Sequence, residues 1–347
     1  MKHNIPFQLL QLTAILLFVS LTACSKKNEN ETTHQLQKIQ ISGEIQGTFY
    51  NITYLDAAGR NYHKEIKASL RDFDKTFSIF DSLSLISRIN ANEANTILNE
   101  SFIKLFTLSQ NIAEKTEGAF DLTVAPLVKL WGFNNGKRIT VDQAMIDSVK
   151  TFVGYKKIQL KGKKLLKTHP NVTLDANAIA QGYSCDIIAD LLERKGVKNY
   201  LVEIGGELKT KGKSPRNDAW KIGINKPIDD STSTISEIQQ ILHLENVALA
   251  TSGNYRKFYF HEGRKYGHSI DPISGYPTTH NLLSVTVIAT DGITADAYAT
   301  AFMVMGIVKS MALLQKLSNI EAYFIYQNEA GENEVLYTRG FKKYLEN

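Results

Sequence analysis

The stretch NAIAQGYSCDIIADLLERKGVKNYLVEIGGELKTK, residues 177–211, decides the fold class. Its first part repeats apolar side chains at helical spacing and ends at a glycine, which predicts a helix over 177–195. Its second part contains two short apolar runs, 200–204 and 207–211, separated by a Gly pair, and these predict paired strands. A helix followed directly by a strand pair indicates helices that pack on a sheet built from hairpins.

The same alternation of helices and strand pairs extends along the rest of the chain. Strand pairs are predicted over 39–55, 156–168, 257–270 and 321–337, further strands over 220–224, 238–244, 247–251 and 284–290, and helices over 62–77, 102–116 and 295–305. A regular strand–helix–strand repeat does not occur. We therefore predict an α+β fold, with helices packed on hairpin-built mixed or antiparallel sheets, as two intimately joined lobes with the functional site between them.

The composition is that of a globular protein with a large core. The chain has 347 residues, of which 43% are hydrophobic and 22% charged. Its 40 basic and 35 acidic residues give a formal net charge of +5, and the basic residues are scattered, so the sequence indicates no nucleic-acid partner. It contains neither a Gly-rich Rossmann fingerprint nor a P-loop, so any nucleotide must be bound in another way.

The N-terminus has the layout of a bacterial secretory signal. A basic start precedes a mainly apolar run over 5–23, whose last residues, LTA, lie directly before Cys24. A cysteine at this point resembles the lipobox of bacterial lipoproteins, in which the thiol is acylated and becomes the mature N-terminus. An uncleaved membrane anchor is the alternative, but the run is short for a span and contains Gln8 and Gln11. The sequence thus predicts a signal peptide over 1–23 and a lipid on Cys24.

The residues after Cys24 indicate how the folded part is attached. Residues 24–38 are polar, so we predict a solvated tether there and a folded domain over 39–347. More than one acyl chain gives stable anchoring, so we expect the protein at the cell envelope, anchored to a bacterial membrane on its extracytoplasmic side. Cys185 then has no disulfide partner within the chain, and we expect it as a buried apolar side chain on a helix.

Several short blocks have the residue types of a binding or catalytic site rather than of a scaffold. They are Gly118-Ala119-Phe120-Asp121, Trp131-Gly132-Phe133, 174–183 (LDANAIAQGY), Gly205-Gly206, 251–256 (TSGNYR), 266–272 (YGHSIDP) and 295–301 (ADAYATA). The Gly pair lies between two strands, where a ligand can approach the backbone. Asp175 precedes the helix as a cap would, and the free N–H groups there suit an anionic group.

Each block alone also has an ordinary structural explanation. A Gly pair can be a bulge, an aspartate before a helix is usually only a cap, and His268 near Asp271 can stabilise a surface turn. Asp296 and Thr300 are four residues apart on a predicted helix and share one face. An isolated pair of this kind is usually solvated or capping, and a metal site is the less common explanation. The blocks become specific through their occurrence together and in order.

Taken in order, the blocks resemble the ApbE family, the FAD:protein FMN transferases. The resemblance covers the chain from Gly43 to its end. It also includes Gly47-Thr48, Ser78-Ile79-Phe80 and Ser87-Arg88-Ile89-Asn90. The predicted lipobox agrees with it, since many family members are lipoproteins.

The resemblance implies a Mg²⁺-dependent phosphoryl-type transfer. The family moves FMN from FAD to a Thr or Ser hydroxyl of a target protein as a phosphodiester and releases AMP, so the implied partner is an exported flavoprotein. Such catalysis depends mainly on positioning and on charge stabilisation at the pyrophosphate, and Mg²⁺ prefers the oxygen ligands that this requires. The implied metal ligands are the backbone carbonyl of Ala178, the carboxylate of Asp296 and the hydroxyl of Thr300.

The resemblance also implies which residues contact FAD. They are Gln46, Phe80, Ala119, Phe120, Asp121, Asp175, Gln181, Thr251 and His268. Phe80 is expected to stack on the isoalloxazine ring. His268 is also expected as the general base for the acceptor hydroxyl, with Asp271 close enough in sequence to orient its ring. A role of His268 in FAD binding alone is the alternative.

The chain departs from the family pattern at three positions. Gln181 stands where the family usually has Lys, Gln46 where Met is common, and Asn254 where Asp is common. The change at Gln181 removes a cation near the FAD and therefore affects the expected nucleotide affinity. It does not involve the implied metal ligands.

The sequence leaves two other functions open. A Mg²⁺-dependent FAD pyrophosphatase, which hydrolyses FAD to FMN and AMP, would use nearly the same residues. A flavin-binding lipoprotein without catalysis is disfavoured, because pure binding has little need of Asp296, Thr300 and His268 together. A hinge-type solute-binding lipoprotein is disfavoured because the regular βαβ units of such folds are missing.

Overall fold

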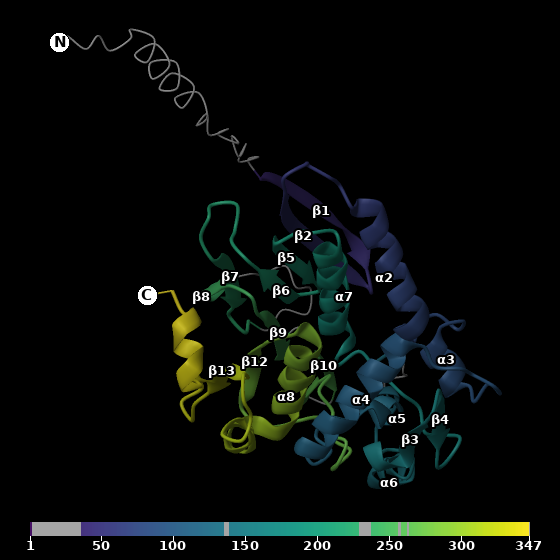
Figure 1. The fold of residues 1–347 in the computed structure, drawn as a ribbon. Helices are drawn as coiled ribbons and strands as arrows, with labels where there is room; N and C mark the ends of the chain where they lie inside the picture. Colours follow the sequence, from purple (N-terminus) through teal and green to yellow (C-terminus); the bar gives the residue numbers. More distant parts are fainter. Residues whose placement is uncertain (2–35, 135–138, 229–236, 256–257, 262–263, 347) are drawn as a thin grey trace. The chain divides into compact units, whose positions relative to one another are not determined.

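The computed structural model describes residue 1 and residues 36–134, 139–228, 237–255, 258–261 and 264–346. The signal segment after residue 1, Cys24 and the tether up to residue 35 lie outside the described residues. From Leu36 onward the chain groups as one compact unit (Figure 1). Its first strand begins at Gln37, two residues before the predicted start of the domain.

An eight-stranded sheet, in which every strand pair is antiparallel, forms the centre of the fold. Its order is β1-β2-β5-β6-β9-β12-β13-β14. The strands are β1 (Gln37–Ile45), β2 (Thr48–Asp56), β5 (Asn199–Ile204), β6 (Glu207–Lys211), β9 (Ala248–Gly253), β12 (Leu282–Ala289), β13 (Glu321–Gln327) and β14 (Asn333–Tyr337). Three of its neighbouring pairs, β1–β2, β5–β6 and β13–β14, are joined by short turns, as antiparallel strands allow, whereas α8 connects β12 to β13.

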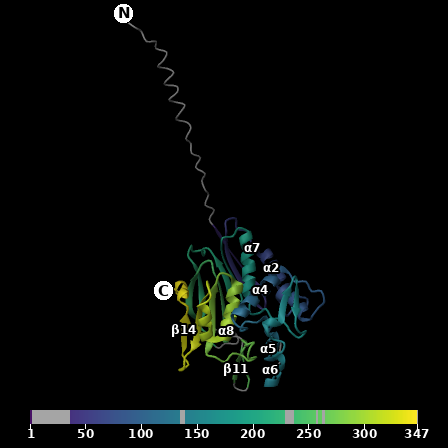
Figure 2. The same cartoon turned by 60° about the horizontal axis from the view of Figure 1, so that its bottom comes forward.

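Three two-stranded sheets and the helices complete the fold. The small sheets pair β3 (Ile158–Lys161) with β4 (Lys164–Lys167), β7 (Trp220–Asn225) with β8 (Ile238–Leu244), and β10 (Phe258–His261) with β11 (Arg264–Gly267). The helices are α2 (His63–Phe77), α3 (Leu85–Asn90), α4 (Glu100–Lys115), α5 (Ala125–Leu130), α6 (Gln143–Lys150), α7 (Ala180–Arg194) and α8 (Gly292–Leu314), with short 3-10 helices η1 (Leu122–Val124), η2 (Tyr155–Lys157) and η3 (Arg339–Tyr344). In Figure 2, α5 and α6 lie near β11, and their apolar side chains share one cluster with Tyr266 of that strand.

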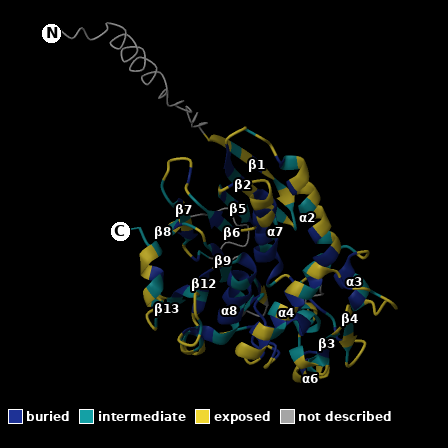
Figure 3. Cartoon of the chain, viewed as in Figure 1, coloured by how far each residue is buried: buried dark blue, intermediate teal, exposed yellow. Residues whose placement is uncertain are grey.

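The two faces of the central sheet pack against different elements. Alternate side chains of β12 and β13 point to opposite faces, so Val287 and Phe324 meet α8, whereas Ile288 and Ile325 meet the β7–β8 hairpin and η3. At the other end of the sheet, β2 and β5 pack against α2 and α7. Figure 3 shows the buried residues concentrated in α7, α8 and the strands behind them. The inner strands β12 and β13 are therefore buried on both faces, whereas the edge strands β1 and β14 are largely exposed. Helices α7 and α8 lie side by side on one face of the sheet.

The longest helix, α8, is a core helix that is interrupted once. Gly306 has a non-helical backbone (φ 72°, ψ 174°) and divides the helix into two parts. In the described part of the chain, α8 is the one helix long and apolar enough to span a membrane by length and composition. Its first half is almost wholly buried against β9 and β12, which is the setting of a core helix in a globular domain.

The predicted α+β class with hairpin-built sheets is confirmed, and the two predicted lobes are not specifically shown. One local prediction is wrong. Asp175 does not cap α7, because the helix begins at Ala180 after a tight turn in which Ala180 N donates to Ala176 O. The side chain of Asp175 instead accepts from Asn177 N within that turn, at 2.8 Å. The expected helix over 177–195 therefore starts three residues later in the structure.

Candidate active site

The candidate site begins where α7 and α8 cross with their backbones in contact. A Cβ at Gly182 would lie 2.1 Å from the carbonyl oxygen of Gly292, and one at Gly292 would lie 2.3 Å from the carbonyl oxygen of Gly182. Only glycine fits at either position. The close approach lets Asp296 Oδ2 of α8 accept a hydrogen bond from Gly182 N, in the first turn of α7, at 2.9 Å. A carboxylate is favourable there, because N–H groups in a first turn lack helical partners.

Oxygen atoms from three segments meet next to this crossing. Thr300 lies one turn after Asp296 on α8, and its hydroxyl is 3.4 Å from the carbonyl oxygen of Ala178, which precedes α7. Ser252 Oγ of β9 lies 3.3 Å from Thr300 Oγ1. The structure therefore places the three predicted metal-ligand residues around one crossing and adds the hydroxyl of Ser252.

These oxygen atoms suit a Mg²⁺ ion as ligands. The group contains one carboxylate, one backbone carbonyl and hydroxyls, all hard oxygen ligands. Neighbouring ligands of octahedral Mg²⁺ are about 3 Å apart, close to the observed spacing of the hydroxyl and carbonyl oxygens. Within the described residues, no three His, Cys, Asp or Glu side chains cluster as a metal site. A metal here would therefore depend on Asp296 for its only charged ligand.

The Gly pair forms the turn between β5 and β6 and lies against the start of α7. Gly205 and Gly206 have φ of +70° and +110°, a backbone region that favours glycine. A Cβ at Gly205 would lie 2.5 Å from Gln181 Nε2, so the Gln181 side chain covers this turn. The Ser184 hydroxyl donates to Gln181 O at 2.7 Å and also lies 3.4 Å from Gln46 Oε1, so it connects these two residues. Two of the three departures from the family pattern, Gln46 and Gln181, thus meet at the first turn of α7.

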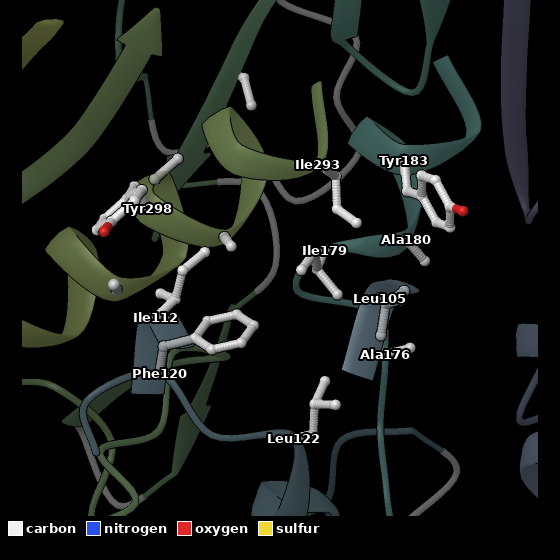
Figure 4. Packing of buried hydrophobic residues seen from close by; sticks show 14 of the residues in the cluster. Leu105, Ile112, Phe120, Leu122, Ala176, Ile179, Ala180, Tyr183, Ile293 and Tyr298 are labelled. Carbon is white, nitrogen blue, oxygen red and sulfur yellow. The ribbon is translucent and has the colours of Figure 1, made fainter. Parts of the chain in front are cut away.

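The segments around Asp121 and Asp175 lie next to each other. Asp175 N donates to Leu122 O at 2.8 Å, and Asp175 Oδ2 accepts from Asn134 Nδ2 at 2.7 Å. Ala119 and Phe120 are buried, and the ring of Phe120, 2% exposed, packs in the core with Ile179 and Ile293 (Figure 4). Both residues therefore offer little surface to a ligand in this structure.

Asp121 has an unusual protonation equilibrium. Burial raises the pKa of its carboxyl to about 6, although hydrogen bonds from the Thr123 side chain and backbone lower it. Asp121 Oδ1 accepts from both Thr123 N and Thr123 Oγ1 at 2.7 Å. The carboxyl thus holds the η1 turn, and its charge changes around pH 6.

His268 lies just after β11, in a loop held by aromatic and polar contacts. Its ring meets the edge of Phe133 at a centroid distance of 6.5 Å. Phe133 in turn packs on Tyr259, whose hydroxyl donates to Trp131 O at 2.8 Å. Asp271 Oδ1 and Oδ2 accept from Ile273 N at 2.9 Å and Ser274 N at 3.2 Å, which stabilises the following turn. The orientation of the His268 ring by Asp271 stays a prediction.

The third departure from the family pattern also has a structural role. Asn254 Oδ1 accepts from Ser269 Oγ at 2.8 Å, and Asn254 Nδ2 donates to Thr278 Oγ1 at 3.0 Å. An amide can both accept and donate, which an ionised aspartate cannot. Asn254 therefore ties the end of β9 to the loop that carries His268.

The remaining predicted contacts differ in exposure. Thr251 Oγ1 hydrogen-bonds Thr286 Oγ1 at 2.8 Å on neighbouring strands. Phe80 is 65% exposed in the loop after α2, so its ring is accessible for stacking. A surface cavity of about 560 Å³ lies between α4 and α8, and another of about 700 Å³ lies between α4, α7 and the start of α8. No predicted site residue lines either of them. Cavity size alone therefore does not identify the site.

Three residues of this region were not predicted from the sequence as part of a site. Ser252 is adjacent to the predicted Thr251 in the same block, so its position was the available signal. Gly182 lies within a recognised block, but its contact with Gly292 joins segments far apart in sequence. Asp186 carried no signal beyond its helix, yet it is buried and bonds the first turn of α8.

Comparison with known proteins gives matches over most of the chain. The sequence model of the ApbE family matches residues 46–324. An FAD:protein FMN transferase of Haemophilus influenzae is 35% identical over 332 residues, which cover 92% of this chain and 92% of that protein. One of Vibrio cholerae is 32% identical over 342 residues, which cover 96% of this chain and 98% of that protein.

Solved structures agree with these sequence matches. The flavin transferase ApbE from Vibrio cholerae superposes with a TM-score of 0.81 at 31% identity, covering 89% of this chain and 100% of that chain. The apo form of the Pseudomonas stutzeri flavinyl transferase ApbE gives a TM-score of 0.79 at 33% identity, covering 89% and 97%. The similarity therefore includes the elements that carry the candidate site.

Proposed function

This chain belongs to the ApbE family, and on that basis we propose that it transfers FMN from FAD to a Thr or Ser hydroxyl of a target flavoprotein. In this reaction the acceptor oxygen bonds to the FMN phosphorus and the pyrophosphate bond breaks. AMP leaves with the bridging oxygen, the hydroxyl proton passes to a base, and the product is a phosphodiester. The observation that carries the proposal is the meeting of Ala178 O, the Thr300 hydroxyl and the Asp296-bearing turn at the α7–α8 crossing.

The proposal assigns Mg²⁺ to these oxygens. Asp296, Thr300 and Ala178 O would hold the ion, which supplies charge neutralisation at the pyrophosphate when bound. The residues themselves position the substrate. No atom lies within 4 Å of a Cβ built at Gly206, so a ligand can approach the backbone of the β5–β6 turn there.

The flavin and the acceptor are assigned to the surrounding loops. Phe80 is exposed and offers a ring for stacking, whereas Asp121 and Asp175 are buried and Gln181 is partly buried. His268 would take the proton of the acceptor hydroxyl, which is a poor nucleophile at neutral pH.

One experiment separates this function from its rivals. The purified full chain is incubated with FAD and Mg²⁺, with and without a flavoprotein acceptor. Flavin fluorescence that stays with the acceptor in a denaturing gel, together with AMP release, supports transfer. AMP release that is independent of acceptor supports FAD hydrolysis, and neither product supports a binding protein.

The location of the reaction is part of the same proposal. A signal peptide over 1–23 and an acylated Cys24 would hold the domain at the extracytoplasmic side of a bacterial membrane. Exported flavoproteins would then be the acceptors. Mass spectrometry of the mature N-terminus tests this, because an acylated cysteine and an uncleaved leader differ in mass.

A further inference from the structure

Asp186 is a buried carboxylate that accepts hydrogen bonds from the first turn of another helix. It lies on α7 and is 6% exposed. Its Oδ1 accepts from Gly292 N at 2.8 Å and its Oδ2 from Ile293 N at 2.9 Å, both in the first turn of α8. These two N–H groups have no partner within α8.

The relationship between the two helices is reciprocal. Asp186 of α7 bonds the first turn of α8, and Asp296 of α8 bonds Gly182 N in the first turn of α7. The backbones touch between these bonds, at Gly182 and Gly292. We call this arrangement of Asp186, Asp296, Gly182 and Gly292 the carboxylate clasp. It fixes both the spacing and the rotation of the helices.

Ordinary capping does not explain Asp186. α8 already has its own N-cap, because Asp291 Oδ1 accepts from Thr294 N at 2.9 Å. Burial raises the pKa of Asp186 to about 6 in spite of its two backbone hydrogen bonds and the attraction of Lys209, while Asp291 adds a repulsion. An ionised carboxylate with a raised pKa reduces the stability of the fold. The role of Asp186 is therefore to position the first turn of α8 rather than to stabilise the fold.

The position concerned is that of Asp296. Four residues separate Gly292 from Asp296, about one helical turn, and four more separate Asp296 from Thr300. A shift or rotation of the first turn of α8 would move both side chains relative to Ala178 O. We propose that Asp186 is a positioning residue that holds Asp296 and Thr300 in register with Ala178 O for binding Mg²⁺. This inference rests on the metal assignment made under the proposed function.

The test compares metal affinity with stability. Mg²⁺ is titrated calorimetrically into the full chain with FAD present, for the wild type and for Asp186→Asn. Asn has nearly the same shape but only one acceptor oxygen. Loss of a hydrogen bond made directly to a metal ligand typically costs about 10–100-fold in affinity. Asp186 instead bonds the turn that precedes the ligands, so we expect Mg²⁺ binding to weaken by about 10-fold, the lower end of that range. The midpoint of urea unfolding at neutral pH should stay near that of the wild type or rise, because a buried charge is removed.

Two control variants identify the cause. Asp190→Asn changes an exposed carboxylate one turn later on α7, and Asp291→Asn changes the N-cap of α8 itself. Both should leave Mg²⁺ affinity within about 3-fold of the wild type. Mn²⁺ in place of Mg²⁺ adds a spectroscopic readout, since the EPR line shape of the bound ion should change in Asp186→Asn and not in the controls. If Asp186→Asn fails to fold, Asp186→Ser, a smaller and uncharged side chain, is tested in the same way.

The outcomes are distinct. Unchanged Mg²⁺ affinity in Asp186→Asn, or an equal loss in Asp291→Asn, overturns the positioning role. A wild type that binds no Mg²⁺ in the presence of FAD overturns the metal assignment and this inference with it. A wild type that binds Mg²⁺ but transfers no flavin overturns the proposed function, whereas a selective loss in Asp186→Asn still supports the positioning role.

Discussion

Asp296 Oδ2 accepts a hydrogen bond from Gly182 N at 2.9 Å, so the carboxylate of α8 lies on the first turn of α7. The two residues are 114 positions apart in sequence. They meet because the absence of side chains at Gly182 and Gly292 lets the two helix backbones touch. The geometry of the candidate metal site thus depends on a contact between two glycines that have no chemistry of their own.

A methyl group at this contact should disturb both the fold and the site. In Gly182→Ala the Cβ would lie 2.1 Å from Gly292 O, and backbone cannot give way as a flexible side chain does. We expect a loss of about 1–3 kcal/mol in the free energy of unfolding, measured in urea, and weaker Mg²⁺ binding. Gly223→Ala is the matched control, because its Cβ meets only the Ile238 side chain at 3.3 Å. Equal stability of the two variants would contradict the close crossing.

The candidate metal ligands should differ in how much each contributes to Mg²⁺ affinity. Asp296→Ala removes the only charged ligand, so we expect Mg²⁺ affinity to fall by more than about 100-fold, beyond the cost of losing a supporting hydrogen bond. Mg²⁺-dependent activity should disappear while FAD binding survives in weakened form. Thr300→Ala should have a milder effect, because a water can replace a hydroxyl. Calorimetry with FAD present measures both, and undiminished metal binding by Asp296→Ala would move the site elsewhere.

The role of His268 can be separated into turnover and binding. As a general base it should contribute about 10²–10⁴ in rate, so His268→Asn should lower turnover by that factor with FAD affinity little changed. The acid limb of the pH–rate profile should flatten, since free histidine titrates at about pH 6.5. His169→Asn, an exposed histidine stacked on Phe152, is the control. Normal turnover at saturating FAD with reduced affinity would make His268 a binding residue.

The raised pKa of Asp121 has a consequence for stability. The folded protein holds this proton more tightly than the unfolded chain, so the contribution of Asp121 to stability falls as pH rises from 3.8, its ordinary pKa, to about 6. Asp121→Asn keeps an acceptor oxygen for Thr123 and removes the titration. Urea unfolding at about pH 4.5 and pH 7 should show the variant gaining stability over the wild type at the higher pH. A stability difference between the two proteins that does not change with pH would refute the raised pKa of Asp121. Asp186 has a raised pKa in both proteins, so its effect on stability cancels in the comparison.

The predicted lipid anchor is independent of the fold. Cys24→Ala should abolish membrane association and leave unfolding unchanged, because a polar tether separates this residue from β1. Fractionation at high salt measures the association, with Cys185→Ala as the control for cysteine loss. Continued sedimentation of Cys24→Ala with membranes would favour an uncleaved anchor.

Several features could be predicted from the sequence because their causes are local. Alternating and helical apolar patterns predicted the strand pairs β1–β2, β3–β4 and β5–β6 and the helices α2, α4 and α8. The ordered blocks predicted the ApbE family, which the comparisons confirm. The spacing of Asp296 and Thr300 placed them on one helix face, which depends only on helical geometry. Short helices such as α3, α5 and α6 were missed, since six to eight residues carry too little periodic signal.

Other features were decided only by tertiary structure, because their causes join distant segments. Asp175 has the sequence features of a helix cap, but its side chain accepts from Asn177 N in the turn before Ala180. The carboxylate that accepts from the first turn of α7 is that of Asp296. Ser252 reaches Thr300 only through the packing of β9 under α8. Asp186 shows no pattern in sequence, since its partners are backbone N–H groups 106 and 107 residues away. The sequence by itself thus determined which groups this protein carries on which elements, whereas the packing of α7 on α8 decided which of them meet.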